Sequence, residues 1–184
     1  MTQITRAHKT AWGSYNDRKD SFDDDEDISR FIGLIHHDES LKTYLKTFLP
    51  KGTFSFKPKP HGKYGVDLGL LSEHGTTVAT IDIERWSAWN EDWPSYYRYI
   101  HFLARKEKFL NQHEAPFFMA FLNFKRDKVL MISHKDINKY PSKPKYFKAK
   151  GVTDIVRELP MSEGYVFGSN ITDTERGLFN VASK

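Results

Sequence analysis

Apolar and polar residues alternate with two different periods along the 184-residue chain, and each period predicts a class of secondary structure. An acidic run at 23–27 suits the first turn of a helix, where exposed backbone N–H groups favour acids. Apolar residues then recur at helical spacing from Phe31 to Phe48, which predicts a helix. His36–Glu39 interrupt this apolar stripe, so the helix is expected to break near residue 38.

Most of the later segments have the pattern of β-strands. A short strand is predicted at 53–56, and two longer strands at 63–86 on either side of a turn at 72–75 that contains glycine. Further strands are predicted at 99–104, at 116–124, which is apolar on both faces like a covered central strand, and at 128–133. Short helices are predicted at 105–112 and 154–159, and residues 164–179 give no clear pattern.

This order of elements predicts one folded domain at 23–184 that follows an N-terminal arm at 1–22. The arm lacks periodicity and has either a disordered or a docked conformation. Helices alternating with strands indicate an α/β (or α+β) fold, in which helices flank a single mixed sheet. The sequence shows no internal repeat and no composition shift that would mark a second domain.

Composition excludes several function classes. The chain has no cysteine, which rules out disulfides, thiolate metal sites and cysteine nucleophiles. The glycine-rich phosphate loops, the GxSxG nucleophile turn and the HExxH zinc motif are all absent. No apolar run reaches membrane-spanning length and no signal peptide is recognisable, so we expect a cytoplasmic, intracellular protein with no membrane partner. The sequence is also compatible with a homodimer.

Charge is distributed unevenly, although the formal net charge is only +4. Residues 17–27 hold seven acids, whereas residues 125–150 hold nine Lys or Arg residues interleaved with Tyr140, Tyr146 and Phe147. A basic and aromatic segment of this kind suits a polyanion such as nucleic acid, and it equally suits a solvated lysine-rich loop. The three tryptophans Trp86, Trp89 and Trp93 can also be interpreted in two ways. They form either a platform on which unpaired bases stack or an apolar lid.

Three carboxylates lie within the two strands predicted at 63–86. Asp67 belongs to the first strand and Asp82 and Glu84 to the second, where alternate residues share a face. An unpaired buried carboxylate is costly, so such acids are expected at a solvated rim, beside a cation or at a metal. Mg²⁺ (or Mn²⁺) is the metal that this ligand set suits, because it prefers oxygen ligands and is often held by one or two carboxylates.

Asp67 on one strand and Asp82-Ile83-Glu84 on the next resemble the motif of the PD-(D/E)xK nuclease superfamily. The order of elements over about residues 28–133 is similar to the α-β-β-β-α-β order of its restriction-endonuclease-like core. The resemblance implies a metal-dependent nuclease that hydrolyses phosphodiester bonds, with DNA a more probable substrate than RNA. It implies that Asp67, Asp82 and Glu84 hold one or two Mg²⁺ ions.

The motif departs from that of the superfamily at two positions. Val66 replaces the proline before Asp67, and the motif lysine is absent. Lys106, at the start of the helix predicted after residue 104, is the expected substitute, with Arg105 and Lys108 as rivals. Alternatively Glu84 itself stands in the place of the lysine, as in some members.

The sequence thus predicts four catalytic residues and a basic surface. Asp67, Asp82, Glu84 and Lys106 are expected to act in catalysis. Nucleic-acid backbone contacts are expected from Arg105, Lys108, Lys125, Arg126, Lys143, Lys145 and Lys148. The alternative is a non-catalytic module on the same fold that binds nucleic acid or protein, in which Asp82 and Glu84 pair with Arg105 or Lys63.

Overall fold

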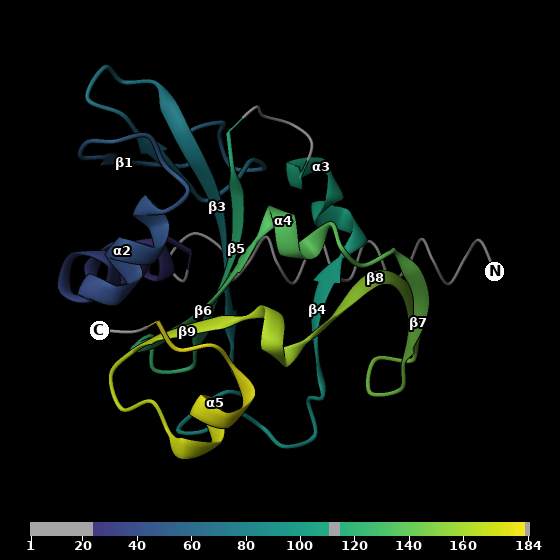
Figure 1. Ribbon diagram of the computed structural model, residues 1–184. Coiled ribbons are helices and arrows are strands. Elements are labelled where there is room, and N and C mark those ends of the chain that lie inside the picture. The colour runs from purple at the N-terminus through teal and green to yellow at the C-terminus, as the bar shows by residue number, and fades with distance from the viewer. Residues whose placement is uncertain (1–23, 111–114, 183–184) are drawn as a thin grey trace.

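The protein folds as an α+β structure with two β-sheets, as the computed structural model shows (Figure 1). It describes residues 24–110 and 115–182, so the arm predicted at 1–22 lies outside the described residues. A six-stranded sheet, here the larger sheet, has the order β1-β2-β3-β5-β6-β9. A three-stranded sheet, here the smaller sheet, has the order β4-β8-β7.

The strands are β1 (Ser55–Pro58), β2 (Leu68–Leu71), β3 (Thr77–Trp86), β4 (Tyr99–Leu103), β5 (Phe117–Asn123), β6 (Lys128–Ser133), β7 (Lys143–Phe147), β8 (Val152–Pro160) and β9 (Tyr165–Gly168). The α-helices are a helix at 24–37, α2 (Glu39–Lys46), α3 (Glu107–Leu110), α4 (His134–Ile137) and α5 (Asp173–Leu178). Short 3₁₀ helices lie at Ala104–Lys106 and Met161–Glu163.

The larger sheet is mixed. β1, β2 and β3 form an antiparallel meander, and the chain then crosses over through β4 and α3 to β5, which lies parallel to β3. β6 returns antiparallel to β5, and β9 closes the edge against β6. Every residue of β5 is buried, which confirms the central strand expected from its apolar pattern.

One face of the larger sheet packs against the helix at 24–37 and α2, as Figure 1 shows. The predicted break lies at Asp38, whose Oδ1 accepts a hydrogen bond from the Leu41 backbone N–H at 3.0 Å and caps α2. The acids at the start of the first helix pair with cations of neighbouring turns: Asp25 with Lys59 at 2.7 Å, and Asp27 with Arg126. These acids therefore fasten the helix to the sheet.

The other face packs against the smaller sheet and α3. The loop after β3 also covers this face, because Trp89 and Trp93 are 0% and 2% exposed and Trp86 packs against the same cluster. Trp89 and Trp93 thus form an apolar lid, and the interpretation of the tryptophans as a base-stacking platform is wrong for these two.

Three sequence predictions about the fold are wrong. The strand predicted from residue 63 begins at Leu68, because the residues before it form turns, so Asp67 lies just before β2 and not within it. The single sheet is two sheets, because β4 pairs with β8 instead of joining the strands around it in sequence. The short helix expected at 154–159 is part of β8, which pairs with β4 on one side and β7 on the other. Long-range strand pairing overrode a helix-like spacing of Ile155, Val156 and Leu159.

Candidate metal and nucleic-acid site

The three predicted carboxylates meet where β2 lies beside β3. Leu68 pairs with Ile81 in this antiparallel pair, so the preceding residue, Asp67, stands opposite Asp82. The Asp67 Oδ2 atom accepts a hydrogen bond from the Ile83 backbone N–H at 2.7 Å, which fixes the carboxyl against β3. We call Asp67, Asp82 and Glu84 the acidic cluster.

The acidic cluster lies on the face of the larger sheet that packs against β4 and α3. Asp82 and Glu84 pair with Met119 and Phe121 of β5, which belong to the core on that face. Asp82 is 5% exposed, whereas about a third of the Glu84 side chain is open to solvent. The cluster is therefore buried at one end and accessible at the other.

Lys106 reaches the acidic cluster from the 3₁₀ turn after β4. Its Nζ atom donates a hydrogen bond to Asp82 Oδ2 and lies 3.1 Å from Glu84 Oε2. Only 13% of its side chain is exposed. Among the three cations that the sequence leaves as candidates, Lys106 is thus the one that bonds two of the predicted acids.

The acidic cluster holds more negative charge than Lys106 neutralises. Burial, followed by the neighbouring Asp82, raises the pKa of Asp67 from 3.8 to about 8, although the Ile83 N–H and the Lys106 ammonium oppose this. Burial and the neighbouring carboxyl thus favour the protonated form of Asp67. Two carboxyls held this close favour a proton or a cation between them.

At Glu84 and Lys106 the neighbouring charges outweigh the effect of burial, so both groups stay charged. Burial acts to raise the pKa of Glu84, but Lys106 and Arg105 outweigh it and lower the pKa below its usual value. Burial acts to lower the pKa of Lys106, but Asp82 and Glu84 outweigh it and raise the pKa above its usual value. The result is an ammonium and a carboxylate that both remain ionised near neutral pH.

Oxygen ligands on adjacent strands are the donor set that Mg²⁺ prefers, and excess negative charge favours any divalent cation. In the described part of the chain, however, no three acidic or histidine side chains stand ready as a metal site. The Lys106 ammonium contacts both Asp82 and Glu84, so a metal ion bound there has to compete with it or move it.

Other basic residues flank the acidic cluster. Arg105 and Lys150 both lower the pKa of Glu84 through their charge. Lys108 Nζ donates a hydrogen bond to the Tyr64 backbone carbonyl at 3.1 Å, so it lies beside the turn that leads to Asp67. Arg105 and Lys108, which the sequence predicts to bind nucleic acid, are therefore placed next to the predicted catalytic residues.

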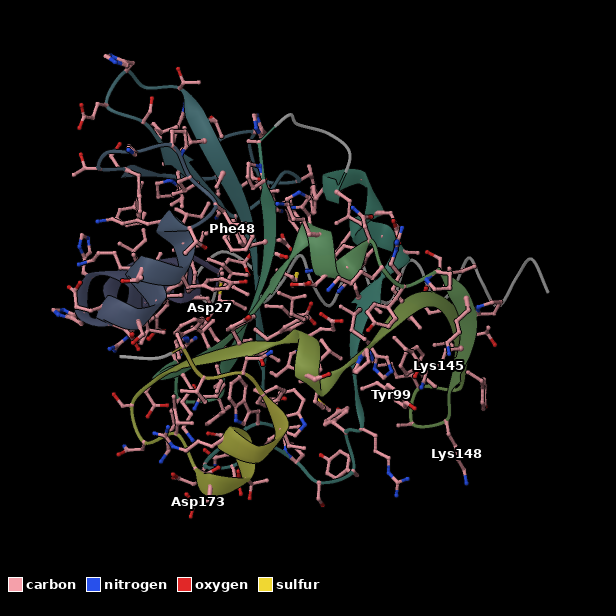
Figure 2. The ribbon with its side chains drawn as sticks, in the orientation of Figure 1. Asp27, Phe48, Tyr99, Lys145, Lys148 and Asp173 are labelled. Atoms are coloured by element: carbon pink, nitrogen blue, oxygen red, sulfur yellow. The ribbon has the colours of Figure 1, made fainter. Side chains whose placement is uncertain are left out.

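The remaining predicted nucleic-acid contacts are spread over other parts of the molecule. Lys143 and Lys145 on β7 both pair with Glu158, at 3.1 Å each, and Lys148 in the following turn is exposed. Figure 2 shows Lys145 and Lys148 with Tyr99 on the side of the smaller sheet, away from Asp27 and Phe48.

Lys125 and Arg126 lie in the turn between β5 and β6, and both form ion pairs. Lys125 pairs with exposed Glu91, and Arg126 pairs with Asp27 and Glu26 of the first helix. The Arg126 side chain is only 11% exposed and binds the helix on the sheet face opposite the acidic cluster. The structure does not bring Arg126 to the predicted site.

Lys150 and Tyr64 are neighbours of the site that sequence reasoning did not single out. Lys150 belongs to the basic segment, but its influence on Glu84 depends on the fold of the hairpin β7–β8. Tyr64 lies three residues before Asp67 and is 77% exposed. An aromatic residue between Lys63 and Gly65, close to a candidate acid, is the only signal the sequence carries for it.

No helix in the described residues is both long enough and apolar enough to cross a bilayer. Comparisons of the chain with protein-family models, with curated proteins and with solved structures gave no significant match.

Proposed function

We propose that this protein is a metal-dependent nuclease that hydrolyses phosphodiester bonds, with DNA as the expected substrate. The observation that carries the proposal is the meeting of Asp67, Asp82, Glu84 and Lys106, which come from three separate parts of the chain. Perturbed ionisation at a partly open site is a common property of functional residues, although ion-pair networks in purely structural roles also perturb it.

The arrangement of the larger sheet supports the resemblance to the PD-(D/E)xK superfamily. A helix precedes three antiparallel strands, and a segment with a short helix leads to a further strand parallel to the third. With β4 set aside in the smaller sheet, this order is similar to the α-β-β-β-α-β order of a restriction-endonuclease-like core. In this proposal the acids lie just before the second strand and in the third strand.

The donor set fits a magnesium or manganese ion. Asp67, Asp82 and Glu84 would hold it, because they offer neighbouring carboxyl oxygens, and a bound cation would take the place of the proton that burial and Asp82 favour on Asp67. When bound, such an ion supplies charge neutralisation at the phosphodiester and lowers the pKa of a water nucleophile.

Lys106 takes the role of the missing motif lysine in this proposal. Its ammonium lies beside two of the acids, so it can stabilise developing negative charge on the phosphate or orient the attacking water. Arg105, Lys108 and Lys150 surround the same region and are suited to hold the phosphate backbone.

One observation favours the alternative, a non-catalytic module on the same fold that binds nucleic acid or protein. Lys106 pairs with Asp82 and Glu84, which is an arrangement that can also serve only to stabilise the fold. A structural pair of this kind has no need of a metal, so metal binding separates the two functions.

The test is cleavage of supercoiled, linear and branched DNA with and without Mg²⁺ or Mn²⁺, together with calorimetric titration of Mg²⁺. Asp82→Ala is expected to abolish both Mg²⁺ binding and cleavage. Asp173→Ala is the matched control, because Asp173 is an exposed acid at the start of α5 (Figure 2). A wild-type protein that binds DNA but neither binds Mg²⁺ nor cuts any substrate would favour the non-catalytic module.

A further inference from the structure

The turn that leads to Asp67 of the acidic cluster carries a tyrosine with most of its surface in solvent. Tyr64 is 77% exposed, the highest value among the exposed large apolar side chains of the described residues. Aromatic rings contribute much to core and interface energetics when they are buried. An exposed ring three residues before a candidate catalytic acid is therefore placed to contact a ligand of that site.

The turn that carries Tyr64 is held firmly. The Lys59 backbone N–H donates to the Asp67 carbonyl at 2.8 Å, and the Gly62 and Gly65 N–H groups donate to the carbonyls of Lys59 and Gly62 at 3.1 and 3.2 Å. Pro60 restricts the backbone further. Gly65 packs so closely that an added Cβ would lie 2.8 Å from the His61 Cβ. The ring is thus presented on a preorganised turn.

The same turn is tied to the segment that carries Lys106. Lys108, two residues beyond Lys106, donates from Nζ to the Tyr64 carbonyl at 3.1 Å. On the other side, Lys63 Nζ lies 5.6 Å from the centre of the Tyr64 ring. An aromatic face, cations and the acidic cluster are thereby brought together, and nucleic-acid strands are bound by such a combination of stacking and phosphate contacts.

We propose, resting on the proposed nuclease function, that Tyr64 stacks on an unpaired base of the substrate strand beside the acidic cluster. In a continuous duplex both faces of each internal base are covered by its neighbours. Only an unpaired or terminal base offers a free face to a protein ring. The substrate class is therefore single-stranded nucleic acid, or a junction with unpaired bases, and not uninterrupted duplex.

The first experiment measures binding of fluorescein-labelled oligo(dT) by anisotropy, with Ca²⁺ in place of Mg²⁺. A relaxed, covalently closed circular duplex, which has no unpaired and no terminal base, is measured in the same buffer as a competitor. Tyr64→Ala is expected to weaken oligo(dT) binding roughly 5- to 150-fold, the range for loss of one base-stacking contact. Duplex binding should not change, and Tyr64→Phe should keep the wild-type affinity for oligo(dT) because it keeps the ring.

Phe124→Ala is the matched control. Phe124 is also an exposed aromatic residue, 48% exposed, but its ring lies against Arg85. Arg85 follows Glu84 on β3 and so points to the opposite face of the larger sheet. This variant should bind oligo(dT) like the wild type.

The second experiment moves a single abasic site along the oligonucleotide. At one position the missing base should weaken binding by wild-type protein and by Tyr64→Phe, but not by Tyr64→Ala, which has already lost the contact. A role of Tyr64 in folding alone would not produce this dependence on one base.

The outcomes separate this inference from the proposed function. Equal oligo(dT) affinity of Tyr64→Ala and wild type overturns the stacking role, while Mg²⁺-dependent cleavage that Asp82→Ala abolishes leaves the nuclease intact. A wild-type protein that binds the closed circular duplex more tightly than oligo(dT) also overturns the stated substrate class. A protein that binds no nucleic acid at all overturns both proposals.

Discussion

Two groups of buried charges in the described part of the chain differ in how well they are balanced. The first is a single pair, Lys128 and Glu175, which are 2% and 0% exposed. Lys128 Nζ donates to both carboxylate oxygens of Glu175 at 3.0 and 3.1 Å and to the Glu91 carbonyl at 2.6 Å. Glu175 also accepts from Trp89 Nε1 at 2.7 Å, so this pair joins β6, α5 and the tryptophan loop.

The second group is the acidic cluster with Lys106. Three carboxyls lie around one ammonium, burial and Asp82 raise the pKa of Asp67, and part of Glu84 is open to solvent. The Lys128–Glu175 pair has one charge of each sign and several hydrogen bonds, so its charges are balanced without a bound ion. A buried ion pair with balanced charges is thus typical of a structural role. A buried group with more carboxyls than its ion-paired lysine balances, next to solvent, indicates a place for a ligand.

The largest expected effect comes from removing one half of the balanced pair. Lys128→Met leaves the Glu175 carboxylate buried without its cation and should lower the free energy of unfolding by about 3–5 kcal/mol. Urea denaturation measures this loss. Lys139→Met is the control, because exposed Lys139 also pairs with two acids yet should change stability little. A small loss for Lys128→Met would show that the pair does not hold the fold.

Removing the cation of the unbalanced group should affect chemistry more than folding. Lys106→Ala is expected to slow cleavage roughly a hundredfold or more, as for loss of one acid–base group, while Mg²⁺ and DNA binding persist. Single-turnover kinetics and calorimetry measure the two effects. If Lys106→Ala cleaves normally and Glu84→Ala does not, Glu84 takes the place of the motif lysine and Lys106 is not required.

The pKa of Asp67, raised by burial and then by Asp82, predicts a pH effect on stability in the absence of metal. The pKa of Asp67 is raised from 3.8 to about 8 in the folded protein, so between these pH values the folded state holds a proton that the unfolded state releases. Stability should therefore fall as pH rises through this window, by up to about 1.4 kcal/mol per pH unit from this group.

Asp67→Asn is the matched test of this pH effect. The amide cannot lose a proton, so the fall in stability with pH should be less steep in this variant, as urea denaturation at several pH values measures. Below the unfolded pKa both proteins should depend on pH alike. An unchanged slope in Asp67→Asn would contradict the close pairing of Asp67 with Asp82.

The smallest expected effect concerns the cations of the smaller sheet. If exposed Lys148 contacts one phosphate, Lys148→Ala should make the dependence of log affinity for oligo(dT) on log salt less steep by about 0.7, the value for single strands. Lys143→Ala and Lys145→Ala should change the slope less, because Glu158 already pairs with both lysines. Lys125→Ala is the control, since Lys125 pairs with Glu91 away from this sheet. If all of these variants have the same salt dependence as the wild type, the lysines are solvated and do not contact phosphates.

Local pattern was enough to predict the central elements. The first helix and its break at Asp38, the hairpin of β2 and β3, buried β5 and its partner β6 all depend on short-range periodicity and turn residues. The same periodicity placed Asp82 and Glu84 on one face of a strand, because side chains alternate along β3.

Tertiary structure decided what short-range pattern does not contain. β4 and β8 are distant in sequence, so their pairing, the separate smaller sheet and the strand at 154–159 were not visible. The burial of Trp89 and Trp93 depends on distant partners, because Trp89 Nε1 donates to Glu175 and the Trp93 ring packs edge-on against Phe179. The sequence left Lys106 as one candidate among three cations, and only the path of the chain through β4 brings its ammonium to Asp82 and Glu84. Charge balance is a property of the folded site, because it depends on which buried groups become neighbours.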